Sequence, residues 1–239
     1  SPMLSQGGFD APPLGRFAEL LIGFGANVQP GQIVAIGGEI GKEEIARALA
    51  ASAYRHGARF ADVSYFDLHV KRARLMYAEE ETLGFVPSWY GERILALGDQ
   101  RCARVGLSGP IAPHLLEDID PGRAGKDQLP FVRESGKVVN DATTNWTIGP
   151  APSRDWAQLV FPDLDVEEAL EKLVGQLIHV LRLDDAPGPA APVCAPRRWL
   201  VCRAVPAGGH PGRPQSCRPL PAGPVGWPVQ RLVVRAVGC

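Results

Sequence analysis

The chain has 239 residues, of which 45% are apolar, and it carries 25 basic against 26 acidic side chains. That length allows one large or two small domains, and a net charge of −1 gives no electrostatic reason to expect nucleic acid or an anionic membrane as a partner. No apolar run reaches the roughly 18 residues of a membrane-spanning helix, no secretory signal is visible, and the five cysteines show no metal-binding spacing, so we expect a cytoplasmic α/β protein.

Apolar residues recur at helical or strand spacing up to about residue 183, after a start over residues 1–13 that we expect to be disordered. In chain order the spacing predicts a helix over residues 14–24, a strand over 33–36, a helix over 43–56, a strand over 60–65, helices over 68–77 and 89–97, a strand over 103–108, a helix over 121–137 that Pro130 interrupts, a strand over 145–148 and a helix over 166–183.

Two features join these elements into one domain. The strand, helix and strand over residues 33–65 form a βαβ unit, which requires parallel strands and a right-handed crossover. The last helix begins with a capping box, Asp165 with Glu168 three residues later. We therefore predict an α/β domain over residues 14–184, with a mainly parallel sheet flanked by helices.

The composition changes abruptly at Asp185, the last acidic residue. Residues 1–185 hold all 26 acidic and 18 basic side chains, a balance of −8, whereas residues 186–239 hold seven Arg, no Lys, and 11 of the 23 prolines. We expect residues 185–239 to form an irregular Pro/Arg-rich tail. Two explanations stay open: a basic, proline-rich partner-binding tail, or a frameshift in a GC-rich gene.

The glycine-rich stretch from Gly37 to Lys42 lies between a predicted strand and a predicted helix, where backbone N–H groups can hold a phosphate. The P-loop pattern would require glycine at Ile36 and Ser or Thr at Glu43, and the adjacent glycines break the dinucleotide fingerprint. Two hypotheses remain: a structural turn, or a nucleotide- or phosphate-binding turn in a non-catalytic domain.

Polar side chains near two strand ends are further candidates. Asp62, Asp67 and His69 lie near the end of a predicted strand, where open α/β sheets place ligands and where a carboxylate with an imidazole can bind a metal. Asp67 is equally suited to cap the following helix. The polar run over residues 143–147 either lines a cleft or forms an edge strand with Trp146 packed inward.

The remaining candidates are isolated. Cys102 precedes a buried strand and is expected in the core, and the sequence contains neither His-Glu-x-x-His nor a Gly-x-Ser-x-Gly nucleophile elbow. The histidines lie far apart, at His56, His114, His179 and His210. From the residues alone, we predict no catalytic, cofactor-binding or metal-binding set.

Nine short segments, in order, resemble the thermophilic metallo-aminopeptidases of the aminopeptidase T / aminopeptidase S group, peptidase family M29. They cover residues 14–21, 27–32, 53–58, 62–63, 145–148, 150–152, 156–157, 160–164 and 167–173. Each segment is weakly informative alone, but together they are specific for the amino-terminal part of the family.

The resemblance implies a cytoplasmic, homodimeric exopeptidase that removes N-terminal amino acids from peptides with two divalent metal ions, typically zinc, cobalt or magnesium. Such a pair lowers the pKa of a bound water and holds the scissile carbonyl. The family's Glu, His and Asp ligands lie in a second domain. The segment after Asp185 contains no Glu and no Asp, so no ligand can be transferred to this sequence. We therefore expect this chain to be inactive by itself.

Overall fold

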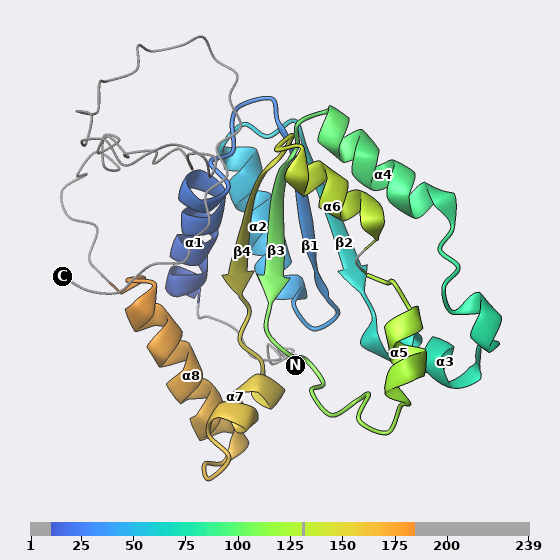
Figure 1. The fold of residues 1–239 in the computed structure, drawn as a ribbon. Helices are drawn as coiled ribbons and strands as arrows, with labels where there is room; N and C mark the ends of the chain where they lie inside the picture. Colours follow the sequence, from blue (N-terminus) through green and yellow to red (C-terminus); the bar gives the residue numbers. More distant parts are fainter. Residues whose placement is uncertain (1–10, 131, 185–239) are drawn as a thin grey trace, which may run out of the picture. The chain divides into compact units, whose positions relative to one another are not determined.

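Four parallel strands form the centre of the computed structural model, which describes residues 11–184 apart from residue 131 (Figure 1). The strands are β1 (Ile33–Glu39), β2 (Phe60–Phe66), β3 (Ala103–Ser108) and β4 (Asn145–Pro150), in the order β2-β1-β3-β4. Every pairing is parallel, so the carboxyl ends of all four strands lie at one edge. The predicted α/β fold class is thereby confirmed, while the expected tail lies outside the described residues.

Helices connect the strands and lie on both faces of the sheet. They are α1 (Ala11–Glu19), which continues as the π-helix η1 (Leu20–Gly25), α2 (Glu43–Arg55), α3 (Leu68–Tyr77), the 3-10 helix η2 (Glu80–Thr82), α4 (Ser88–Asp99), α5 (Pro121–Lys126), α6 (Arg133–Asn140), α7 (Arg154–Val160) and α8 (Val166–Val180). None of these helices in the described part of the chain has the length and apolarity needed to cross a membrane.

The first helix differs from its prediction at both ends. It begins at Ala11, so residues 11–13, which we expected to be disordered, form its first turn. Pro12 and Pro13 are tolerated there because the first N–H groups of a helix have no intrahelical partner. Its end is a π-helix whose Gly25 lies against Thr147 of β4.

Other elements differ in length. β1 and β4 continue three and two residues beyond the predicted strands, to Glu39 and Pro150. α8 ends at Val180, three residues before its predicted end. The helix predicted over residues 121–137 is interrupted around Pro130, as predicted, and its second part, α6, ends at Asn140, three residues beyond the predicted end. The short α7 was not predicted.

The main core lies between one face of the sheet and α1, η1 and α2. Figure 1 shows α2 behind the strands and α1 beside β4. Side chains of neighbouring strands meet there in register, Val34 beside Ala103 and Ile36 beside Val105. A second, smaller cluster joins α7 to α8. Its buried members are Ala157, Ala169, Leu170 and Leu173.

Gly109, directly after β3, combines a left-handed backbone with a close approach. Its φ is +116°, and a Cβ placed there would lie 2.7 Å from the carbonyl oxygen of Ala151. We expect Gly109→Ala to lower the free energy of unfolding by about 1–3 kcal/mol, since both the φ value and the contact disfavour a side chain. Urea denaturation measures the change.

The control is Gly106→Ala in the adjacent strand. A Cβ at Gly106 meets nothing nearer than Cγ1 of Ile148 at 3.5 Å, so its effect stays within about 1 kcal/mol. If the free energy of unfolding fell equally in the two variants, the positive φ and the close contact at Gly109 would not be the cause of the destabilisation.

Candidate functional site at the carboxyl edge of the sheet

The carboxyl edge of the sheet is the place to search for a site, because open parallel sheets bind ligands where the strand order reverses. In the order β2-β1-β3-β4 the reversal lies between β1 and β3. The chain leaves β1 for β2 on one side and then crosses to β3 on the other. The stretch from Gly37 to Lys42 ends at this position.

The side chain of Lys42 fills the reversal point. It is 2% exposed, and its Nζ lies 2.7 Å from Oε2 of Glu39 at the end of β1. The same Nζ donates to the carbonyl oxygens of Leu107 (3.2 Å) and Gly109 (2.8 Å) at the end of β3. An ammonium group has three N–H donors, and all three have acceptors here.

The glycine-rich stretch contains the predicted structural turn, but the turn is shorter than expected and is confined to Ile40 and Gly41. Gly37 and Gly38 belong to β1 and pair with Ser64 and Tyr65 of β2. The N–H of Gly41 donates to Oε1 of Glu43 at 2.9 Å. Since the lysine and this N–H are already paired with carboxylates, the stretch offers a phosphate little to bind, which argues against the phosphate-binding alternative.

The predicted group of Asp62, Asp67 and His69 is not brought together. Asp62 lies within β2 and pairs with Arg93 of α4, 2.6 Å from Oδ2 to Nη2. Asp67 is five residues further along, about 16 Å at the rise of a β-strand, and caps α3 by accepting from the N–H groups of His69 (2.8 Å) and Val70 (3.3 Å). The N-cap interpretation is confirmed for Asp67, and the shared metal site was wrong.

Carboxylates of the loop after β3 are also paired. A hydrogen bond from the Arg72 guanidinium lowers the pKa of the Asp118 carboxyl below its usual range. Asp127, whose side chain is 1% exposed, lies 3.5 Å from Nζ of Lys71 and 3.8 Å from Nε of Arg74. These pairs join α3 to the loops before α5 and α6, and they indicate a structural role.

The polar run at β4 packs into the domain. Thr144 and Thr147 are buried, and Asn145 accepts a hydrogen bond from Gln32 at 2.8 Å. β4 is the edge strand of the described sheet. The edge position agrees with the edge-strand alternative, but the alternation of the strand points Thr147 toward the main core and Trp146 to the opposite face, so Trp146 is not packed into that core.

Cys102 and the histidines have separate environments. Cys102 is buried as predicted, and burial raises the pKa of its thiol to about 11. His56 lies against Ser52 and Glu19, and His114 is paired with Glu117. His179 lies in the last turn of α8, and His210 is outside the described residues.

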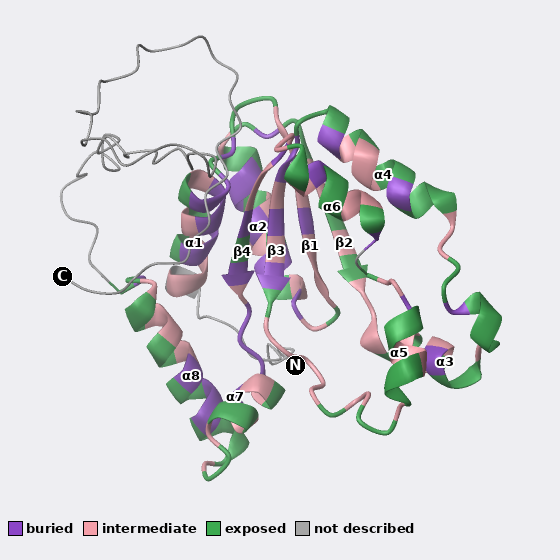
Figure 2. Cartoon of the chain, in the orientation of Figure 1, coloured by how far each residue is buried: buried purple, intermediate pink, exposed green. Residues whose placement is uncertain are grey.

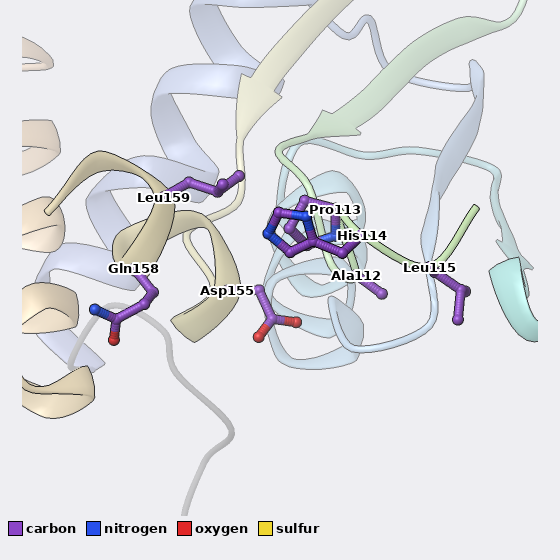
Figure 3. A pocket seen from close by; sticks show the side chains of 7 residues that line it. All are labelled: Ala112, Pro113, His114, Leu115, Asp155, Gln158 and Leu159. Carbon is purple, nitrogen blue, oxygen red and sulfur yellow. The ribbon is translucent and has the colours of Figure 1, made fainter. Parts of the chain in front are cut away.

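An open hollow of about 430 Å³ that no sequence pattern predicted lies between α7 and the loop after β3. Figure 3 shows Asp155 and Leu159 of α7 on one side and His114 and Leu115 of the loop on the other. Its lining residues are Ala112, Pro113, His114, Leu115, Asp155, Gln158 and Leu159. One imidazole and one carboxylate are fewer than the three protein ligands of a catalytic zinc site. Across the described residues, no three His, Cys, Asp or Glu side chains are grouped to hold a metal ion.

Comparison with known proteins decides the family. The model of the family described as "Thermophilic metalloprotease (M29)" matches residues 11–191. The chain belongs to the M29 metalloprotease family. The resemblance in the sequence analysis is thereby confirmed.

Relatives within the M29 family are bacterial aminopeptidases. Aminopeptidase T of Thermus thermophilus is 36% identical over 174 residues, and Aminopeptidase 2 of Geobacillus stearothermophilus is 29% identical over 174 residues; each match covers 72% of this chain and 42% of the relative. The solved structure of wild-type AmpT from Thermus thermophilus superimposes with a TM-score of 0.65 at 33% identity, covering 70% of this chain and 43% of that one. The chain thus spans about two fifths of the length of the relatives that it matches.

Substitution of the buried Lys42 tests whether its side chain stabilises the carboxyl edge of the sheet. We expect Lys42→Met to lower the free energy of unfolding by about 1–3 kcal/mol, because it leaves Glu39 and two carbonyl groups without their donor. The matched control is Lys137→Met, which removes an exposed pair with Asp141 and should cause no measurable change. Chemical denaturation gives the unfolding midpoint of each variant. Equal midpoints for the two variants would mean that Lys42 does not stabilise the contact between β1 and β3.

Proposed function

We propose that this chain is the amino-terminal portion of a metal-dependent aminopeptidase that removes N-terminal amino acids from peptides. The aminopeptidases to which the matched segment is similar support this proposal. The proposal includes a cytoplasmic homodimer for the whole protein and zinc, cobalt or magnesium as its metal.

The proposal rests on one combined observation: the chain matches the M29 family, but its described residues lack a complete metal-binding site. The match covers 42% of the relatives, and the described residues do not fit a catalytic metal ion, because no three His, Cys, Asp or Glu side chains are grouped among them. The candidate carboxylates Asp62, Asp67 and Asp127 are instead paired with Arg, Lys or backbone N–H groups. We therefore assign the described domain a scaffolding role and derive no catalytic step from it. The metal ligands would belong to the remainder of the enzyme.

The chain by itself should not hydrolyse peptides. We expect no release of p-nitroaniline from aminoacyl-p-nitroanilides when cobalt, zinc or magnesium is added to the purified 239-residue protein. Full-length Aminopeptidase T of Thermus thermophilus, assayed beside it, is the positive control. Turnover by this chain that a chelator abolishes would show that it holds a complete metal site.

We further propose that residues 185–239 are the product of a frameshift. The loss of Asp, Glu and Lys at one point and the rise in Pro and Arg support this proposal. Translating the gene in the other two frames after codon 185 should give an acidic, helix-periodic continuation with Glu, His and Asp. Stop codons in both frames would instead make the basic tail a genuine partner-binding segment.

A further inference from the structure

One row of residues crosses the sheet on the face opposite the main core. Register pairs Ser64 of β2 with Gly37 of β1, Gly37 with Gly106 of β3, and Gly106 with Ile148 of β4. Val34, Ile36 and Val105, the alternate residues of the same strands, point into the main core. We call Ser64, Gly37, Gly106 and Ile148 the open row.

The helices on this face stop short of the open row. α4 contacts the preceding row, where Arg93 reaches Asp62, and α4 packs on α6 through Gly98 and Val138. Figure 1 shows α6 in front of the amino-terminal half of the strands, with the carboxyl-terminal half in open view.

Distances and exposure agree with this view. A Cβ at Gly37 would meet only Oγ of Ser64, at 4.0 Å, and one at Gly106 would meet only atoms of β4. Ile148 is 54% exposed. At the carboxyl ends of the strands, Figure 2 shows intermediate or exposed residues alternating with buried ones in β3 and β4, as expected for one open face and one core face. Ser64, Gly37 and Gly106 are of intermediate exposure, and the two glycines have no contact from a helix of the described part of the chain at the position of a Cβ.

A parallel sheet with a bare half-face is unusual. All-parallel sheets occur almost only with both faces covered, because their connections place helices on each side. Here the four strands meet that condition on the core face and only in part on the other. A covering element is therefore expected on the open row.

We infer that the open row is the docking surface for the carboxyl-terminal region of an M29 aminopeptidase. This inference rests on the proposed function. The shared segment covers 42% of Aminopeptidase T and 43% of the solved AmpT chain, so more than half of each relative lies outside it. The open row carries no charge, and its two glycines let a neighbouring backbone approach closely, which fits a packed protein segment better than a charged partner.

Cysteine labelling tests the inference in whole proteins. In the 239-residue chain, Ser64→Cys places a nearly isosteric thiol in the open row, and Gly106→Cys is a second probe of the same row. Ala51→Cys is the control, on the exposed side of α2 across the sheet. The same substitutions are made at the superimposed positions of full-length Aminopeptidase T. Maleimide labelling is followed by peptide mapping, and the protonated, buried Cys102 should react slowly in the folded chain.

We expect the thiol at position 64 to react readily in this chain and about tenfold or more slowly in the full-length relative, because a packed interface must open before the reagent enters. The control at Ala51 should react alike in both. Equal reactivity of the open row in both proteins would overturn the inference. Slow maleimide labelling of position 64 in the 239-residue chain itself would also overturn the inference. If that slow labelling became fast on dilution, the occupant of the open row would be a second copy of the chain.

Labelling and catalysis are independent readouts. If the 239-residue chain hydrolysed peptides by itself, the proposed function would need revision whatever the labelling rates. If the chain were inactive but the open row equally reactive in both proteins, only the docking surface would be wrong.

Discussion

The ammonium group of Lys42 connects the two strands that meet where the sheet reverses its order. Its partners are the carboxylate that ends β1 and two carbonyl oxygens at and beyond the end of β3. In a doubly wound sheet this crevice usually binds a phosphate or a cofactor. A buried cation with its acceptors already supplied makes the position structural, and it explains why a strand–glycine–helix connection in this domain does not resemble a nucleotide site.

Most of the fold follows from local sequence patterns. α3 and β3 have the predicted bounds because their flanking signals are strong: Asp67 caps the helix and Gly109 ends the strand. The end of β1 was missed because Gly37 and Gly38 have low strand propensity. Pairing overrides this propensity, since Gly37 pairs with both β2 and β3 and Gly38 pairs with β2. α7 has only seven residues, too few for a helical period to be recognised.

The candidate site could be predicted less well, because its contacts connect distant parts of the chain. Asp62 and Arg93 are 31 residues apart, and Lys42 and Gly109 are 67 apart. No local pattern shows that an acidic side chain within a strand will meet an arginine of a later helix. By contrast, the role of Asp67 depends only on its own helix, and for that reason its N-cap role could be recognised from the sequence.

The same long separations affect synthesis of the protein on the ribosome. Lys42 emerges with its βαβ unit, but its acceptors at Leu107 and Gly109 are made 65 and 67 residues later. At about 5–20 residues per second this delay is about 3–13 s. During that interval the lysine of the first two strands remains hydrated, so the reversal point closes only after β3 has been made, and the sheet is completed later still, when β4 follows.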